Sequence, residues 1–183
     1  MRTLEEAART GRLVRIARHR LERESAFSTG FVAGLGDRLV VLNLVSDTIR
    51  LDGFTLLRLA DITSAAADFE VRRFYERALE MKGLEPQTAP EVDLATMEQA
   101  VRTIDQHHPP LVVHQEMADP GVCFVGRVAE YLKSGFRMRL ITPSAEWVPD
   151  RTLFRYAAIT ASTSRGNTRQ RWRRWPRWTR THP

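Results

Sequence analysis

Short stretches rich in apolar, β-forming residues recur between polar turns over the first third of this 183-residue chain. Short runs of aliphatic and β-branched residues are separated there by turn dipeptides, Gly36-Asp37 and Asp52-Gly53, which is typical of antiparallel strands joined by tight turns. The pattern predicts strands over 12–20, 28–37, 38–45 and 54–63.

Helical periodicity occurs in three places. The first is 3–10, where Thr3 and Glu6 have capping-box spacing. The second, over 69–81, interleaves apolar and charged residues and is ended by Lys82-Gly83. The third has its apolar face at residues 94, 97, 101 and 104, with Asp93 as the expected cap.

The strand pattern then returns in the same order, with strands expected over 111–117, 122–132, 136–142 and 152–160. The segment RLADIT at 58–63 shares Arg, Ala, Ile and Thr with RYAAIT at 155–160, and each set of strands contains a glycine inside a strand, Gly30 or Gly126. Such a glycine commonly marks a bend or bulge. The order of the parts therefore predicts two copies of one fold in tandem.

Residues 161–183 depart from that plan, because they hold seven arginines, three of the four tryptophans and no acidic residue. A genuine cationic tail of this kind could bind anionic lipid or stack on single-stranded bases. Trp has the single codon TGG, so the neighbouring reading frame is partly recoverable, and it places an apolar residue at every third position. A frameshifted terminus is therefore the favoured interpretation, and reading the coding DNA tests it.

Charge and composition limit the classes of protein that the chain can belong to. Of 28 basic residues seven lie in the tail, which leaves 21 against 22 acidic residues and a net charge of −1 over 1–160. No apolar run approaches the roughly 18 residues of a membrane span, and a single Cys excludes an internal disulfide. The N-terminus is typical of neither a signal nor a transit peptide, so a cytoplasmic protein is expected.

Five segments carry a family resemblance: GFVAGLGDRLVVLNLV and IRLDGFTLLRLADIT early in the chain, and HQEMADPGVCFVGRV, ITPSAEW and YAAIT later. Over about residues 10–163 the chain resembles uncharacterised bacterial proteins with two Sm-like (SH3-like) barrels in tandem. The resemblance implies a mainly β protein with helices (α+β), in which two small, strongly bent antiparallel barrels are joined by a helical linker. The expected parts are 1–83 (first barrel with its helices), 84–110 (linker and helix), 111–163 (second barrel) and 164–183 (Arg/Trp-rich tail, frameshifted or disordered).

Sm-like proteins often form rings and bind RNA, and the resemblance implies this only loosely. The chain departs from the Sm pattern at the RNA site. Asp37 and Asn43 are wider apart than the Asp and Asn of that pattern, and Asp52-Gly53 stands where an Arg-Gly step would help to bind a base. The RNA pocket is therefore not carried over to this chain.

Metal-type ligands gather at residues 107, 108, 114 and 116, which are His, His, His and Glu, with Cys123 nearby in sequence. Tetrahedral zinc needs three or four converging ligands. The adjacent histidines cannot easily both face a site that His114 and Glu116 share, and a polar helix end explains them as well. Cys123 is expected to be buried in a strand. We therefore expect no metal, no cofactor and no catalytic residue.

Four arginines form the candidate interaction surface. Arg15 and Arg18 belong to a basic N-terminal stretch, and Arg58 and Arg155 occupy matching places in the two sets of strands. Solvated charge and salt-bridge scaffolding are the alternative explanations. The expected function is a non-enzymatic binding or assembly module whose partner is another protein or its own copies. Nucleic-acid binding through the Sm-like barrels and basic termini is the alternative, and a metal-dependent hydrolase using His114 and Glu116 ranks last.

Overall fold

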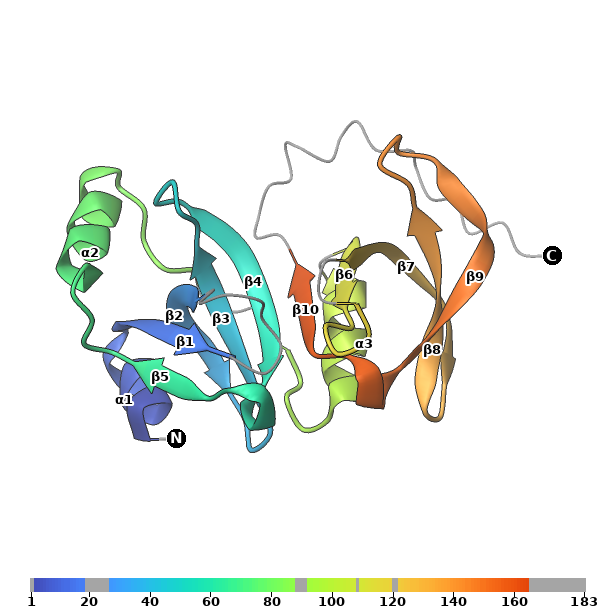
Figure 1. The fold of residues 1–183 in the computed structure, drawn as a ribbon, viewed down its shortest axis with the longest axis horizontal. Coiled ribbons are helices and arrows are strands. Elements are labelled where there is room, and N and C mark those ends of the chain that lie inside the picture. Colours follow the sequence, from blue (N-terminus) through green and yellow to red (C-terminus); the bar gives the residue numbers. More distant parts are fainter. Residues whose placement is uncertain (1, 19–26, 88–91, 108, 120–121, 165–183) are drawn as a thin grey trace.

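The structure is a computed structural model that describes residues 2–18, 27–87, 92–107, 109–119 and 122–164. In this part of the chain ten antiparallel strands form one open sheet, accompanied by three α-helices (Figure 1). We call residues 2–66 the N-terminal half and residues 97–164 the C-terminal half.

The N-terminal half contains one helix, five strands and a 3₁₀ turn. These are α1 (Arg2–Thr10), β1 (Leu13–Ala17), β2 (Phe27–Leu35), β3 (Leu39–Val45), β4 (Leu51–Arg58), η1 (Leu59–Asp61) and β5 (Ser64–Ala66). Helix α2 (Arg72–Met81) lies between the halves in sequence. The C-terminal half has the same succession: α3 (Met97–His107), β6 (Leu111–His114), β7 (Cys123–Leu132), β8 (Gly135–Ile141), β9 (Trp147–Arg155), η2 (Tyr156–Ala158) and β10 (Ala161–Ser164).

The strand order across the sheet is β5-β1-β2-β3-β4-β10-β6-β7-β8-β9. Strands β4 and β10 lie side by side at the centre of Figure 1 and join the two halves. The expected pair of closed barrels is therefore wrong. That prediction assumed that each set of strands must close to remove its own exposed edges. In the structure one edge strand of each half pairs with the other half instead. Strands β5 and β9 are the edges of the open sheet.

The two halves share local backbone geometry as well as strand order. The β2–β3 register shifts between Val32 and Gly34, and the β7–β8 register shifts between Val128 and Glu130. Further shifts occur at corresponding places in the β3–β4 and β8–β9 pairs. The turns that follow β3 and β8 each contain a non-glycine residue with positive φ, Ile49 at 53° and Ala145 at 64°.

The glycines inside β2 and β7 allow a neighbouring strand to come close. A Cβ atom on Gly30 would lie 2.6 Å from the carbonyl oxygen of Asn43, and one on Gly126 would lie 2.1 Å from that of Arg139. Both distances are shorter than real Cβ contacts. A side chain at either position would therefore push β3 or β8 away.

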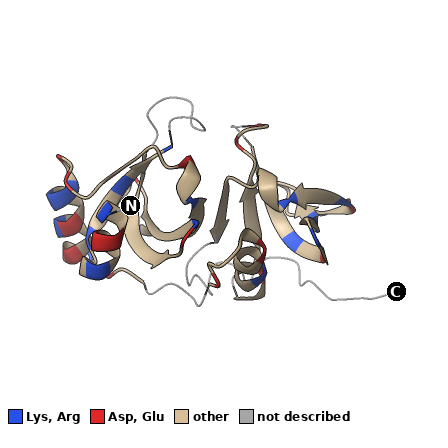
Figure 2. Ribbon diagram, turned by 90° about the horizontal axis from the view of Figure 1, so that it is seen from below, with Lys and Arg blue, Asp and Glu red and all other residues tan. Residues whose placement is uncertain are grey.

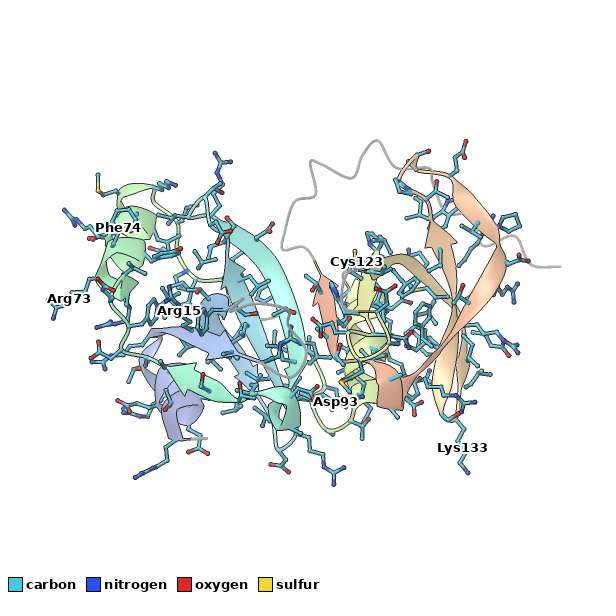
Figure 3. All side chains as sticks on the ribbon, viewed as in Figure 1. Arg15, Arg73, Phe74, Asp93, Cys123 and Lys133 are labelled. Carbon is cyan, nitrogen blue, oxygen red and sulfur yellow. The ribbon has the colours of Figure 1, made fainter. Side chains whose placement is uncertain are left out.

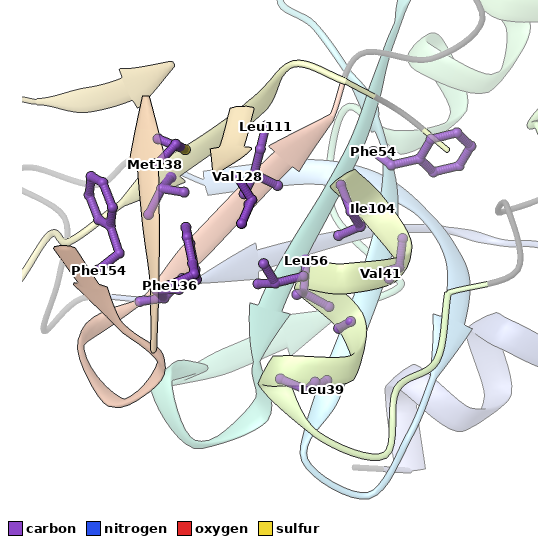
Figure 4. Close-up of a cluster of buried hydrophobic side chains, with 14 residues drawn as sticks. Leu39, Val41, Phe54, Leu56, Ile104, Leu111, Val128, Phe136, Met138 and Phe154 are labelled. Carbon is purple, nitrogen blue, oxygen red and sulfur yellow. The ribbon is translucent and has the colours of Figure 1, made fainter. Parts of the chain in front are cut away.

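The largest hydrophobic cluster contains residues of both halves (Figure 4), and two smaller clusters lie mainly in the N-terminal part of the chain. Leu39, Val41, Phe54 and Leu56 of β3 and β4 belong to it, together with α3 and the apolar residues of the C-terminal half. The α3 members are Ala100, Val101 and Ile104. Helix α3 thus packs into the interior instead of only connecting the halves.

Helix boundaries follow local chemistry. Lys82 is the C-cap of α2, and Gly83 with φ +62° follows it, as expected from the sequence. The start of α3 differs from expectation, because the Gln99 N–H donates to the Thr96 hydroxyl at 3.1 Å, whereas the Asp93 carboxylate accepts from the Ala95 N–H before the helix begins. Thr96 is therefore the capping residue.

The tail prediction lies almost entirely outside the described residues, which end at Ser164. Ser164 itself pairs with Phe54 in the sheet, and residues 161–164, which were expected to depart from the repeat, form β10. The frameshift hypothesis stays a prediction.

Within the described part of the chain no helix is long and apolar enough to cross a membrane. The longest, α3, has 11 residues.

Two phenylalanines give a matched test of the core. Phe136 is fully buried and stacks on Phe154 with ring centroids 5.7 Å apart, whereas Phe74 is 64% exposed and projects from α2 into solvent (Figure 3). We expect Phe136→Ala to lower the free energy of unfolding by about 3–5 kcal/mol, and Phe74→Ala to change it by less than about 0.5 kcal/mol. Urea denaturation measures both, and equal losses would contradict this assignment of the core.

Candidate interaction site at the β4–β10 junction and the sheet edges

The β4–β10 junction is an antiparallel strand pair between segments more than 100 residues apart. Leu57 pairs with Ala161, Leu56 with Ser162 and Thr55 with Thr163. The hydroxyl groups of Thr55 and Thr163 form a hydrogen bond of 3.3 Å. Leu56, Ser162 and Ala161 are all buried there, so the junction is closed to water as a protein interior is.

Arg58 fastens the end of this junction. Its Nη2 group donates to the carbonyl oxygens of Tyr156 at 2.6 Å and Ala157 at 2.8 Å, both in η2 of the other half. Arg155 holds the corresponding place in the C-terminal half, because it too ends its strand immediately before a 3₁₀ turn. Arg155 is exposed. Arg58 therefore lies in the β4–β10 junction, whereas Arg155 lies in the edge strand β9.

A buried ion pair connects the halves a second time. The Arg18 guanidinium donates to both Glu116 oxygens, at 2.7 and 3.0 Å, and the two side chains are only 6% and 11% exposed. Burial alone would raise the pKa of Glu116, but hydrogen bonds from Arg18 and Thr160 and the nearby charges outweigh it. The pKa of Glu116 is therefore lowered, and its carboxylate stays charged against Arg18.

His114 lies two residues before Glu116 in the half-buried end of β6. Burial lowers its pKa, the charge of Glu116 opposes that shift, and the charge of Arg18 adds to it. Its backbone takes part in fastening β10, since the Thr160 N–H and hydroxyl both donate to the His114 carbonyl oxygen. Thr63 makes the same two bonds to Ala17 in the N-terminal half.

Asp105 anchors α3 to β7. Its carboxylate accepts hydrogen bonds from the Val128 N–H at 3.3 Å and the Tyr131 hydroxyl at 3.1 Å, and the Arg127 guanidinium lies 3.5 Å away. Burial and the Asp105 charge raise the pKa of Tyr131, so this hydroxyl remains a donor. The Arg102 guanidinium covers the Tyr131 ring at 4.0 Å. These contacts fix the helix whose apolar side packs against β3 and β4.

Among the described residues, β5 and β9 are the edge strands of the sheet, and no described strand pairs with their outer sides. The Tyr156 N–H donates to the Ser134 carbonyl, and antiparallel pairs exchange hydrogen bonds at every second residue. The N–H groups of Leu153 and Arg155 therefore face away from β8. Leu153 is 46% exposed, whereas Leu56, which holds the same place in β4, is 1% exposed.

The remaining sequence-predicted residues do not converge on one site. Arg15 lies between the rings of Phe69 and Phe27, at 4.5 and 5.3 Å, on the first half of the sheet. Cys123 is exposed and not buried as expected, because it starts β7 at the end of the sheet. His107 ends α3, and His108 lies outside the described residues.

The Glu116 carboxylate is already engaged by Arg18. Among the residues that the structure describes, no group of three or more His, Cys, Asp or Glu side chains is arranged to hold a metal ion.

Sequence reasoning missed the two short strands, β10 at the junction and β5 at the edge of the sheet. Their residues, Ser-Ala-Ala and Ala-Ser-Thr-Ser, lack the alternation that predicts a strand. The one available signal was the shared Ile-Thr that precedes each strand, because Thr63 and Thr160 tie the following strand to β1 and β6.

Comparison with known protein families, characterised proteins and solved structures found no match for this chain. The resemblance to tandem Sm-like proteins is therefore neither supported nor opposed by relatives, and it stays a prediction.

Glu116→Gln tests the buried ion pair. At neutral pH we expect the free energy of unfolding to fall by about 3–5 kcal/mol, because Arg18 stays buried without its carboxylate partner. The pKa of Glu116 is lowered in the folded protein, so its stabilising effect is present above the ordinary value of 4.5 and is lost as the pH falls through the folded pKa. The difference from wild type, measured by chemical denaturation, should be constant near neutrality and shrink below pH 4.5.

The matched control is Glu130→Gln, which breaks the exposed pair with Arg137 and should cost less than about 1 kcal/mol. Protonation of His114, whose pKa is lowered, also reduces stability as the pH falls below 6.5. Glu116→Gln also removes the raising effect of the Glu116 charge on the pKa of His114, so the His114 contribution does not cancel, and the test is the shrinkage of the difference below pH 4.5. A pH-independent difference down to strongly acid conditions would contradict the ion-pair account.

The paired arginines give a second test of the junction. We expect Arg58→Ala to lower the free energy of unfolding by about 1.5 kcal/mol, because two charge-assisted hydrogen bonds to η2 are lost. Arg155→Ala should change it by less than about 0.5 kcal/mol in dilute solution, since that side chain is exposed. Thermal unfolding of the two variants checks this, and a larger loss for Arg155→Ala would show that the assignment is wrong.

Proposed function

We propose that this protein is a non-enzymatic assembly module that binds other protein chains through the edge of its sheet. The observation that carries the proposal is the contrast between β4 and β9, which hold the same place in the two halves. The outward side of β4 pairs with β10 and Leu56 is buried there, whereas no strand in the described part of the chain pairs with the outward side of β9, where Leu153 is exposed. An exposed strand edge is a template for another strand.

The shared strand order, register shifts and turn geometry of the two halves support a further part of this proposal, that the chain arose by duplication. If one unit was duplicated, the same strand edge occurs twice in the chain. In β4 this edge pairs with β10, and in β9 it forms the edge of the sheet.

Charge favours a protein partner over a nucleic acid. Basic and acidic positions are interspersed over the ribbon (Figure 2), and several arginines are paired with carboxylates, as in Arg72–Glu76, Arg102–Glu98 and Arg137–Glu130. Nucleic-acid binding draws mainly on a clustered basic surface. RNA binding through the basic termini is therefore the competing outcome of the test.

Sedimentation velocity tests the proposal. We expect the mean mass of the full chain to rise with protein concentration and to depend weakly on salt, because strand pairing uses backbone hydrogen bonds. A chain ending at Ser164, which keeps β10, should behave alike. Single-stranded RNA should show little binding to that shorter chain.

Two results would overturn the proposal. One is a protein that stays monomeric at all concentrations. The other is RNA binding by the shorter chain that weakens by orders of magnitude between roughly 50 and 200 mM salt.

A further inference from the structure

We propose that one face of the sheet in the C-terminal half, formed by β7, β8 and β9, binds an acidic segment of a partner protein. Arg127 pairs with Arg139 in the β7–β8 register, and Arg139 pairs with Arg151 in the β8–β9 register. Directly opposed residues of antiparallel strands have their side chains on the same face, so these three side chains form one line across the strands. We call them the arginine row. The row lies on a face of the sheet and not along its edge, so the inference goes beyond the proposed function.

The arginine row lies on the outer side of these strands. Val128 pairs with Met138, and both side chains are buried in the largest hydrophobic cluster. Successive residues of a strand point to opposite faces, so the arginines next to these two residues project away from the cluster. Arg151 is exposed, and Arg139 is partly exposed. A partner in solution can therefore reach the guanidinium groups of both.

The charges of the arginine row are only partly balanced. The Arg127 guanidinium lies 3.5 Å from the Asp105 carboxylate. Arg139 donates to the Val148 carbonyl oxygen at 3.3 Å, and that partner is uncharged. Within the described ranges no carboxylate forms an ion pair with Arg139 or Arg151. Like charges directly opposite each other destabilise a sheet, and an anion that binds between them removes this repulsion.

The same positions of the N-terminal half are covered by the chain itself. Phe31 pairs with Asn43 and Asn43 with Phe54, and this row has the same place relative to the register shifts as the arginine row. All three residues are buried. Phe31 belongs to a cluster with Leu79 of α2, and the Gln87 N–H donates to the Asn43 side-chain oxygen at 2.9 Å. This face therefore holds a covering segment in one half, whereas the matching face of the other half carries charge.

The sign of the charge identifies the segment that fits the face in the C-terminal half. Residues 165–183, which follow β10 in the chain, hold seven arginines and no acidic residue, so their charge has the same sign as the arginine row. Complementary charge is therefore supplied by carboxylates of another chain. Arginine suits such a partner, because its planar guanidinium binds a carboxylate through two parallel hydrogen bonds.

Spacing and an adjacent leucine favour a protein segment. Neighbouring strands lie about 4.8 Å apart, so the arginine row spans roughly 10 Å, and alternate residues of an extended segment recur about every 6.7 Å. Two or three carboxylates at alternate positions therefore reach the row. Leu153 lies two residues after Arg151 on the same face and is 46% exposed. An apolar side chain beside the carboxylates covers it, whereas a phosphate backbone has no such group, so RNA is the competing outcome of the test.

Residue-resolved NMR of the full chain locates the binding site. The probe is a synthetic ten-residue peptide with three glutamates and one leucine at four alternate positions, and its control has glutamine in place of each glutamate. We expect the glutamate peptide to shift the amide signals of Arg139, Arg151 and Leu153, and the glutamine peptide to shift none of them. Shifts confined to residues 165–183 would overturn the inference, because the basic tail would then be the binding segment.

Arg151→Gln tests the contribution of the arginine row. Arg151 is exposed, so the variant should keep the fold. We expect its dissociation constant for the glutamate peptide, measured by fluorescence anisotropy, to rise about fivefold, the value of one exposed ion pair. The matched control is Arg73→Gln, which removes an exposed charge from α2 (Figure 3) and should leave the dissociation constant unchanged. Equal effects of the two substitutions would contradict a specific site.

Single-stranded RNA is the competing probe. We expect Arg151→Gln to leave the RNA affinity of the full chain unchanged, because the row binds carboxylates of a protein segment. A fivefold loss of RNA affinity in this variant, with no loss of peptide affinity, would assign the row to a nucleic acid and overturn the inference.

Sedimentation velocity separates this surface from the sheet edge. Arg151→Gln should keep the concentration-dependent mass of the wild type, because its side chain belongs to a face of the sheet. A variant that binds the peptide as tightly as wild type would overturn the arginine row and leave edge-mediated assembly standing. Loss of self-association in the same variant would show that Arg151 belongs to the edge contact, and it would overturn a separate docking surface.

Discussion

Pairing between β4 and β10 is the interaction on which the rest of this structure depends. Each half has a strand whose outer N–H and C=O groups need partners, and a backbone polar group buried without one is costly. Each half supplies these partners for the other, because β4 pairs with β10 and Leu56 lies opposite Ser162. The sheet becomes continuous as a result, and α3 can pack into a core shared by both halves.

Specific side chains then hold the junction in place. Arg58 reaches the carbonyls of η2, and Arg18 forms a bidentate pair with Glu116 across a separation of 98 residues. Both arginines donate several hydrogen bonds in a fixed planar geometry, which suits positions where orientation matters. The junction is therefore specified by backbone pairing and oriented by charge-assisted contacts.

Much of the fold could be read from the sequence because long strands and amphipathic helices repeat at their own periods. Eight strands and three helices were expected near their positions, although the predictions for β4 and β9 ran up to five residues too far, into the 3₁₀ turns η1 and η2. The short strands β5 and β10 were not, because small residues such as Ala65 and Ser162 become strands only through their neighbours.

That omission also explains the mistaken barrels. Because β10 was not predicted, β4 had no predicted partner strand. Closure of a barrel was then the remaining way to pair its exposed edge. The matching of Arg58 and Arg155 could be read from the sequence, but their different roles could not, since they depend on which edge is paired. The Arg18–Glu116 contact carries no local signal at all.

Residue-resolved amide hydrogen exchange in dilute solution tests the central claim most directly. If β4 and β10 are paired, the amides of Leu56 and Ser162 exchange as slowly as those of the interior strands, while that of Leu153 on the free side of β9 exchanges rapidly. Fast exchange at Leu56 and Ser162, equal to that at Leu153, would show that the halves are not joined in one sheet.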